Sequence, residues 1–253
     1  MCGIRHLLSC HSRIKRILVF LSVNKYLRGI EADDDNAKIL REATAKLHVG
    51  ATNVTEKVDN YVSEPAHQLI VGIGGTTRPG SSTERALRMA LKAAEEQGAR
   101  TILFDGPFLA SLSMYDPASE RNDAEREFIE AVRSADGLII ASPAYHGGLS
   151  GLVKNALDLL EETSKDKRPY LHSRPVGLIV TAYGWQATGA TLASLRTIVH
   201  ALRGWPTPFG AGFNTLESRF AEDGTCSDSS AASSLALVAQ QVMSFSCTDK
   251  NHS

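Results

Sequence analysis

Residues 69–83 read Leu-Ile-Val-Gly-Ile-Gly-Gly-Thr-Thr-Arg-Pro-Gly-Ser-Ser-Thr. The first residues form an apolar run, which is typical of a strand buried on both faces of a sheet. The glycine-rich part that follows leads into residues 83–97, whose apolar side chains recur at helical spacing. A buried strand, a glycine-rich loop and an amphipathic helix in this order predict a parallel α/β sheet.

The same alternation of strand and helix continues along the chain. The expected strands are 68–74, 100–105, 137–142, 176–181 and one within 207–214. The expected helices are 83–97, 122–134, 150–162, 188–203 and one within 229–245, with a loop over 106–121. Continuous apolar strands between amphipathic helices predict a flavodoxin-like three-layer α/β/α sandwich, whose five-stranded parallel sheet has the order 2-1-3-4-5.

The loop after the first strand has the chemistry of a phosphate cradle. Its glycines allow backbone N–H groups to approach an anion, and the following helix presents its positive end. Hydroxyl groups and one guanidinium add further donors suited to phosphate. The phosphate-binding residues predicted here are Thr76, Arg78, Ser81, Ser82 and Thr83.

Two better-known phosphate loops fit this segment less well. The spacing of Gly75 and Gly80 resembles a P-loop, but Ser81 stands where the P-loop lysine must be. A dinucleotide fingerprint is also incomplete, because Thr77 occupies the position of its third glycine. Taken alone, the segment is equally compatible with an ordinary polar loop that caps the next helix through one of its hydroxyl groups.

Two further loops, 142–148 and 182–189, combine aromatic side chains with bare backbone. A proline fixes the chain direction in the first, a tyrosine can support a ring, and glycines leave N–H groups free for ring edges. In the second, Tyr183 and Trp185 would either cover a ring or pack in a subunit interface. Because parallel strands end at one edge, the loops together predict a site for a mononucleotide with a planar head group, with FMN as the leading candidate. The cofactor-binding residues predicted in these two loops are Pro143, Tyr145, His146, Gly147 and Gly184.

Three segments resemble motifs of one known family. Residues 75–83 resemble its Gly-Ser-x-Arg-x-x-Ser phosphate loop, and residues 142–148 resemble its Pro-x-Tyr-Asn-Gly flavin loop. Residues 153–158 are similar to its Leu-Lys-Asn-Ala-x-Asp helix. Through these segments, residues 68–246 resemble the NADPH-dependent FMN reductase family of flavodoxin-like flavoproteins. The resemblance implies FMN and NADPH or NADH as cofactors and a homodimer or tetramer as the assembly.

Two departures from the family pattern are Thr76, in place of the usual serine, and His146, in place of the usual asparagine. Both keep their hydrogen-bonding ability, so flavin binding is still expected, while redox tuning and substrate preference are left open. Lys154, Asn155 and Asp158 are interpreted as capping, packing or subunit contacts.

The predicted activity is hydride transfer from a nicotinamide cofactor to FMN. Transfer from C4 of nicotinamide to N5 of the flavin needs no protein acid or base, so no catalytic residue is predicted. The reduced FMN would leave as a product for a monooxygenase, or the enzyme would retain it and reduce quinones, azo dyes or metal oxyanions. A flavodoxin-type electron carrier is the non-enzyme alternative. Such carriers are usually strongly acidic, and this chain has a formal net charge of −1.

The composition narrows the possible partners and compartment. A near-neutral chain gives no general reason to expect nucleic acid or an anionic membrane as partner. The 4 cysteines are widely separated and form no CxxC pair, so no metal site is predicted and a reducing cytoplasm is the expected location. The longest apolar stretch near the start is far shorter than the roughly 20 residues of a membrane span.

The chain is expected to divide near residue 66. Residues 1–66 have no place in the α/β repeat, and we expect a poorly ordered N-terminal extension, with an organelle transit peptide as the alternative for its basic start. Residues 67–248 are expected to form the flavodoxin-like FMN-binding reductase domain. Within it, the expected loop 106–121 carries enough apolar residues to predict a surface covered by a second copy of the chain. These residues are Pro107, Phe108, Leu109, Leu112, Met114 and Tyr115.

Overall fold

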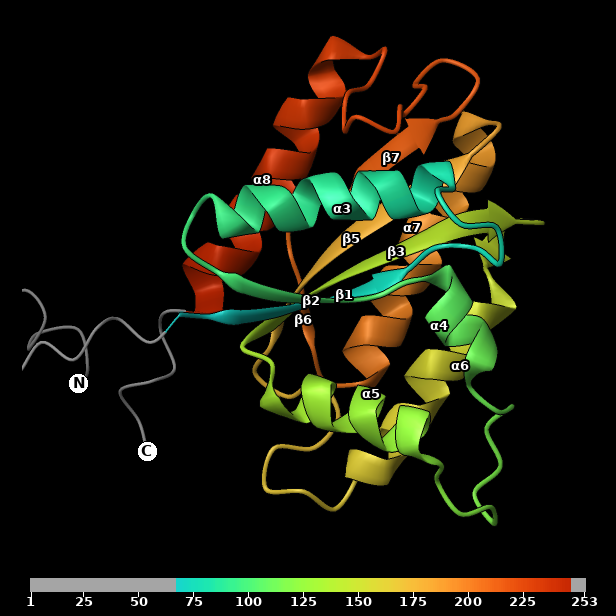
Figure 1. The fold of residues 1–253 in the computed structure, drawn as a ribbon, viewed down its shortest axis with the longest axis vertical. Coiled ribbons are helices and arrows are strands. Elements are labelled where there is room, and N and C mark those ends of the chain that lie inside the picture. The colour runs from blue at the N-terminus through green and yellow to red at the C-terminus, as the bar shows by residue number, and fades with distance from the viewer. Residues whose placement is uncertain (1–66, 247–253) are drawn as a thin grey trace, which may run out of the picture. The chain divides into compact units, whose positions relative to one another are not determined.

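A parallel sheet lies at the centre of the fold (Figure 1). The structure is a computed structural model, and it describes residues 67–246. The strands are β1 (Leu69–Gly74), β2 (Arg100–Phe104), β3 (Gly137–Tyr145), β4 (Gly148–Leu149), β5 (Pro175–Ala182), β6 (Trp205–Pro206) and β7 (Ala211–Asn214). The main order is β2-β1-β3-β5, and β6 and β7 both pair with β5 in parallel. With β6 and β7 taken as one interrupted strand, the predicted order 2-1-3-4-5 is confirmed.

The sheet has seven strands rather than the five predicted, for two local reasons. First, Pro206 and Pro208 interrupt the last strand, because proline has no N–H to donate to a ladder. The N–H of Thr207 still reaches the carbonyl oxygen of Val176 at 2.9 Å, and pairing resumes at Ala211. Second, the chain turns back after β3, so that β4 forms a short antiparallel hairpin with it.

Helices cover both faces of the sheet, as predicted (Figure 1). One face carries α3 (Ser82–Glu95) and α8 (Ser229–Ser246), whose buried side chains form one hydrophobic cluster with the sheet. The other face carries a second cluster built on the remaining helices. These are α4 (Gly106–Ser111), α5 (Asp123–Ser134), α6 (Gly151–Asp158), the 3-10 helix η1 (Leu159–Thr163) and α7 (Trp185–Ala201).

Side-chain caps fix where several of these helices begin. Ser81, Asp105 and Ser150 each accept a hydrogen bond from the backbone of the following first turn, in α3, α4 and α6 respectively. Asn122 and Glu125 form a reciprocal capping box at the start of α5. Because four of these helices start with a satisfied cap, the loops that precede them have fixed exit directions.

The expectation for residues 106–121 was wrong in two respects. The segment begins with α4 rather than a loop, because Asp105 caps the chain with Pro107 in the first turn. Leu109 and Leu112 are buried in the core of this same chain, and Phe108 and Tyr115 pack partly against it. Pro107 and Met114 are exposed, as predicted, Met114 with 80% of its surface.

Other element boundaries moved by a few residues. The helix expected at 188–203 begins at Trp185, so the third loop is reduced to residues 183–184. The helix expected at 150–162 ends as an α-helix at Asp158 and continues as η1. The predicted extension, residues 1–66, lies outside the described residues, which all belong to a unit that begins at Ala66.

Across residues 67–246, no helix is long and apolar enough to cross a membrane. The same residues contain no group of three or more His, Cys, Asp or Glu side chains arranged to hold a metal ion.

Candidate functional site

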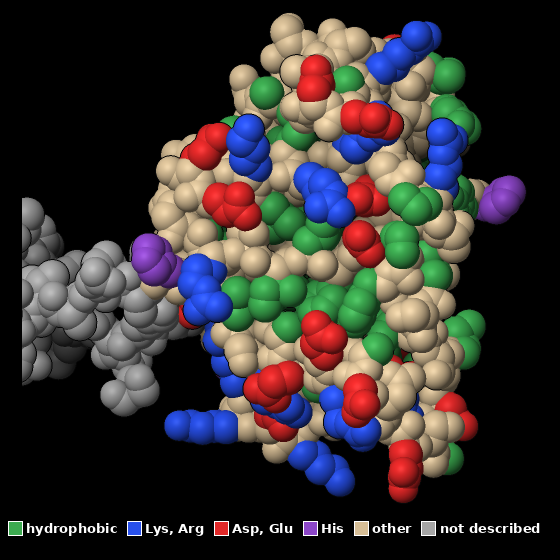
Figure 2. Space-filling view, viewed as in Figure 1, with side chains coloured by type: hydrophobic (Ala, Val, Ile, Leu, Met, Phe, Trp, Pro, Cys, Tyr) green, Lys and Arg blue, Asp and Glu red, His purple; other side chains and the backbone are tan. Residues whose placement is uncertain are grey.

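The three predicted loops lie side by side at the carboxyl edge of the sheet, at the right in Figure 1. The parallel registers require this arrangement: Gly74 pairs with Ala141, and Pro143 pairs with Thr181. Tyr145 and Tyr183 each follow two residues after that second pair. Hydrophobic side chains gather along the corresponding margin of the space-filling view (Figure 2). The three candidate loops therefore lie at one edge of the sheet, as expected for a doubly wound fold.

The glycine-rich loop leads directly into the N-terminus of α3. Ser81 is the N-cap, and its hydroxyl accepts the N–H of Glu84 at 3.3 Å. The N–H groups of Ser82 and Thr83 lie in the first turn, before the first intrahelical hydrogen bond, so they face out of the helix end. Arg78 is exposed beside them. This set of hydroxyl, N–H and guanidinium donors suits a phosphate dianion.

Thr76 and Thr83 use their hydroxyl groups within the protein. The Thr76 hydroxyl donates to the carbonyl oxygen of Arg78 at 3.1 Å and accepts its N–H at 3.2 Å, which tightens the turn of the loop. The Thr83 hydroxyl is buried and lies 2.6 Å from the hydroxyl of Thr181, so it joins α3 to β5. For Thr83, the backbone N–H is the group left to meet an anion.

A carboxylate that the sequence interpretation missed completes this loop. Glu84, only 5% exposed, accepts the N–H of Gly80 at 2.9 Å and the Nε–H of Arg88 at 2.8 Å. Arg88 also lies 3.6 Å from Asp105, whose carboxylate accepts the N–H of Phe108 as the cap of α4. Pairing with Arg88 offsets the negative charge of Glu84 next to the candidate phosphate loop. The signal was available, since a hydroxyl cap followed three residues later by glutamate is the pattern of a capping box.

Two glycines allow the loop to lie directly against α4. A Cβ atom on Gly106 would lie 1.7 Å from the carbonyl oxygen of Thr76, and one on Gly75 would lie 2.7 Å from the nitrogen of Gly106. Gly75 also has φ +130°, a conformation that side chains disfavour. The position of the candidate phosphate loop therefore depends on the absence of a side chain on either side of this contact.

The second loop is a two-residue β-hairpin turn. Tyr145 and Gly148 form its closing pair, and the central residues His146 and Gly147 have φ of 53° and 82°. Positive φ at both positions defines a type I′ turn, for which Asn-Gly is the preferred sequence. The family's usual asparagine is therefore explained by backbone geometry. His146 adopts the same conformation and, like Gly147 and Tyr145, is exposed.

Pro143 lies inside β3 rather than after it. The strand continues to Tyr145, and Pro143 itself is buried. Pro143 is tolerated there because β3 has already passed its last pair with β1, at Ala141. The hydroxyl of Ser142 accepts the N–H of Ser150 at 2.9 Å, which holds the two ends of the hairpin together. Pro143 thus shapes the strand end, while the exposed residues that follow it are available to a ligand.

The third loop is short and ends in bare backbone. Gly184 is the N-cap of α7 and provides no side-chain cap. Its carbonyl oxygen accepts the hydroxyl of Thr188 at 3.0 Å. On either side of it, Tyr183 is 79% exposed and Trp185 is 56% exposed. These two aromatic side chains stand at the edge of the same site.

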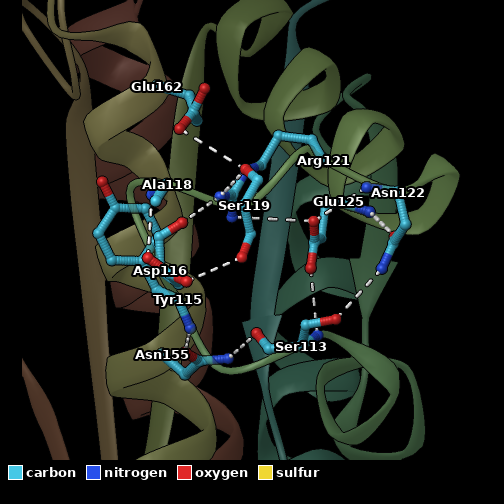
Figure 3. Close-up of polar contacts among 10 residues, drawn as sticks. All are labelled: Ser113, Tyr115, Asp116, Ala118, Ser119, Arg121, Asn122, Glu125, Asn155 and Glu162. Carbon is cyan, nitrogen blue, oxygen red and sulfur yellow. Dashed lines mark hydrogen bonds and ion pairs between the residues drawn. The ribbon is translucent and has the colours of Figure 1, made fainter.

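Asn155 positions the segment between α4 and α5 (Figure 3). Its side-chain oxygen accepts the N–H of Tyr115 at 2.8 Å, and its side-chain nitrogen donates to the carbonyl oxygen of Ser113 at 2.9 Å. From the opposite side, the carboxylate of Glu125 accepts the N–H of Ser113 at 3.2 Å and that of Asn122 at 3.0 Å. Asn155 therefore has the packing role that the sequence interpretation favoured over catalysis.

Arg121 closes the same segment from its other end (Figure 3). Its guanidinium lies over the ring of Tyr115, is 3.7 Å from Glu162, and donates to the carbonyl oxygens of Asp116 and Ser119. Burial, reinforced by the carboxylate of Glu162, raises the pKa of the Tyr115 phenol. A backbone N–H and a hydroxyl that bond to the Asp116 carboxylate lower its pKa. Next to Asn155, Lys154 and Asp158 form an exposed ion pair of 2.6 Å on α6.

The fold and this edge together define a class of protein: a doubly wound α/β protein with a candidate mononucleotide site at the carboxyl ends of its strands. A model of the NADPH-dependent FMN reductase family matches residues 69–213, more than half of the chain, and the chain belongs to this family. The family inferred from the loop motifs is thereby confirmed.

Individual relatives cover part of the chain. An FMN-dependent NADPH-azoreductase of Staphylococcus haemolyticus (strain JCSC1435) is 35% identical over 100 residues, which are 40% of this chain and 50% of the relative. The protein of the same name from Staphylococcus aureus (strain USA300) is 36% identical over 124 residues, 47% of this chain and 61% of the relative. This chain therefore matches about half to three fifths of the length of these curated relatives.

A solved structure shares the fold. The crystal structure of an oxidoreductase from Corynebacterium diphtheriae aligns with a TM-score of 0.57 at 18% identity, over 74% of this chain and 100% of that chain.

Proposed function

We propose that this protein is an NAD(P)H-dependent FMN reductase. The observation that carries the proposal is the N-terminus of α3, with the Ser81 and Ser82 hydroxyl groups and the exposed guanidinium of Arg78, at the same sheet edge as an exposed type I′ hairpin. The first group suits the phosphate of FMN and the second suits the edge of its ring. The donor set therefore fits FMN on its chemistry.

Each part of the edge would have a separate task. The first turn of α3 would hold the phosphate, and Glu84 would keep the loop closed through its hydrogen bond with Gly80. Backbone N–H groups at Gly147 and Gly184 would address the ring, with Tyr145 against it. Bound FMN would supply the redox chemistry, accepting a hydride from NADPH or NADH. The protein binds, orients and shields, so no side chain is assigned a catalytic role.

The fate of the reduced flavin separates two versions of this function. In the first, FMN is a substrate that leaves reduced and supplies a monooxygenase. In the second, FMN stays bound and electrons pass to a quinone, an azo dye or a metal oxyanion. The names of the curated relatives, FMN-dependent NADPH-azoreductases, support the second version. The near-neutral net charge of −1 weighs against a flavodoxin-type carrier.

Steady-state oxidation of NADPH distinguishes these versions. With free FMN as the varied substrate, a rate that saturates with FMN at catalytic enzyme concentration supports a releasing reductase. A rate that depends on quinone or azo dye, with FMN bound in stoichiometric amount, supports a retaining one. Absence of NADPH oxidation with either kind of acceptor would contradict the proposed function.

We also propose a cytoplasmic homodimer or tetramer. Residues 106–121 give only weak support for a dimer, because Leu109 and Leu112 are buried in their own chain and Phe108 and Tyr115 are partly buried there. Further support comes from the edge strand β2, where Ile102 and Leu103 are half-buried, and from exposed Met114. Figure 2 shows a band of hydrophobic side chains at the level of the label β2 in Figure 1. Light scattering at micromolar protein decides the question, and the mass of a single chain with FMN bound would contradict the dimer.

A further inference from the structure

Trp185 is an exposed aromatic side chain held in one orientation. Its indole is 56% exposed, yet its Nε1–H donates to the carboxylate of Glu217 at 3.2 Å. The same carboxylate oxygen accepts the side-chain N–H of Asn214 at 2.6 Å, and Asn214 is only 6% exposed. A half-exposed indole is thus fixed through one carboxylate to a buried amide.

The segment behind Trp185 is itself fixed to the sheet. Asn214 is the last residue of β7 and pairs with Ala182 at the end of β5. The carbonyl oxygen of Ala182 accepts both the N–H of Thr215 at 2.7 Å and its hydroxyl at 3.2 Å. Two strand ends therefore support the indole, and little conformational freedom remains to be lost when a ligand contacts it.

Exposed apolar side chains lie close to Trp185 and Glu217 along the chain, and one carboxylate contacts the indole. Tyr183 and Leu216, on the two adjoining loops, are 79% and 64% exposed. The charged group that contacts the indole is the carboxylate of Glu217. A flat, apolar surface favours a planar ring, and an adjacent carboxylate disfavours an anionic one.

We propose that Trp185, oriented by Glu217 and Asn214, binds the planar ring of a neutral aromatic electron acceptor, and that Glu217 selects against anionic acceptors of the same shape. This inference rests on the proposed function, because it places the acceptor beside Gly184, one of the residues assigned to the flavin ring. Trp185 is then a specificity-determining residue, and Glu217 is a positioning residue that also sets charge preference.

The chain contains 2 tryptophans, which provides a matched control. Trp205 is 65% exposed but lies on β6, opposite Pro175 at the start of β5, and so at the other edge of the sheet. Trp205→Phe leaves Trp185 as the single tryptophan, and Trp185→Phe leaves Trp205. The test uses the FMN-loaded protein without NADPH and measures tryptophan fluorescence. 1,2-Naphthoquinone should quench Trp205→Phe saturably, and it should quench Trp185→Phe only by collision, in proportion to its concentration.

Kinetics test the specificity with NADPH and two acceptors, 1,2-naphthoquinone and its 4-sulfonate. Trp185→Ala should raise KM for the neutral quinone about tenfold, the ratio that corresponds to one aromatic contact, while Trp205→Ala leaves it unchanged. Glu217→Gln keeps a hydrogen-bond acceptor and removes the charge. It should lower KM for the sulfonate by roughly threefold and change KM for the neutral quinone by less than twofold.

Three results would overturn the inference. One is a KM for the neutral quinone in Trp185→Ala that stays within twofold of the parent. Another is a ratio of the two KM values that Glu217→Gln does not change. The third is a lower oligomeric mass of Trp185→Ala by light scattering, which would make Trp185 an interface residue. Failure of the proposed function would be recognised separately, because the parent itself would then bind no FMN or show no reduction of bound FMN by NADPH.

Discussion

Replacing Gly106 with alanine should displace the glycine-rich loop from α4. The added Cβ would lie 1.7 Å from the carbonyl oxygen of Thr76 and 2.6 Å from its nitrogen, whereas real Cβ atoms essentially never come closer than 3.0 Å to such atoms. Both partners are backbone atoms, so no side-chain rotation relieves the overlap. The loop or the helix must move by more than an ångström. Overpacking of this kind costs about 1–3 kcal/mol of unfolding free energy, and we expect the upper end of that range.

The same change should weaken FMN binding. Thr76 belongs to the loop that we assign to the phosphate. Hydrogen bonds in proteins have donor–acceptor distances of about 2.7–3.2 Å, so a displacement of more than about 1 Å breaks them. Loss of one hydrogen bond to a charged group corresponds to about 1.5–3 kcal/mol, so the affinity should fall at least tenfold. Urea unfolding measures the first effect, and titration of FMN fluorescence measures the second.

Gly189→Ala is the matched control. Gly189 lies within α7, and a Cβ atom there would have no neighbour within 4 Å. Alanine at this helical position should raise the unfolding free energy by about 0.5–1 kcal/mol and leave FMN affinity unchanged. If Gly106→Ala unfolded at the same urea concentration as the parent and bound FMN equally well, the contact between the loop and α4 would be refuted.

Four further changes test separate parts of the account. Arg78→Ala should weaken FMN binding by about 1 kcal/mol, a small effect because the guanidinium is exposed, and should leave riboflavin binding unchanged. Equal FMN affinities of the variant and the parent would remove Arg78 from the site. His146→Asn should stabilise the type I′ turn by about 0.5 kcal/mol in urea unfolding, and a loss of stability would argue against that turn. Arg174→Ala should lower the free energy of unfolding by about 3 kcal/mol, because the fully buried guanidinium donates to three backbone carbonyls. As a control, Arg126→Ala, at an exposed ion pair, should change it by about 0.5 kcal/mol or less. Similar values for the two variants would contradict the burial of Arg174. Removal of residues 1–62 should leave folding and flavin reduction intact, and an insoluble or inactive product would place part of the fold before residue 63.

The sheet was predictable because its strands have a strong local signal. Apolar runs such as Leu138–Ala141 report burial on both faces wherever they occur, and helical periodicity marked the layers between them. Boundaries were less predictable where tertiary structure decides. Pro143 suggested the end of a strand, but β3 continues to Tyr145 because it pairs with β5 at Pro143 and with β4 beyond it. The proline is tolerated because β1, on the other side, has already ended.

The contacts that shape the site depend on residues far apart in the sequence. Glu217 bonds Trp185 across 32 positions, and Asn155 bonds Tyr115 across 40. No local pattern reports such a contact before the strand order is known. Thr83 shows that a local pattern can also mislead. Its position in a hydroxyl-rich loop predicted a hydroxyl free to bind a ligand, but Thr181 of β5 is its partner.

Equilibrium titration with FMN and with riboflavin tests the central claim most directly. The two ligands share the ring and differ in the phosphate, which we assign to the N-terminus of α3 and the loop before it. The account predicts saturable FMN binding at micromolar concentration or tighter, quenched flavin fluorescence, and riboflavin binding at least tenfold weaker. No FMN binding in that range, or equal affinities for the two flavins, would contradict a phosphate site at this edge of the sheet.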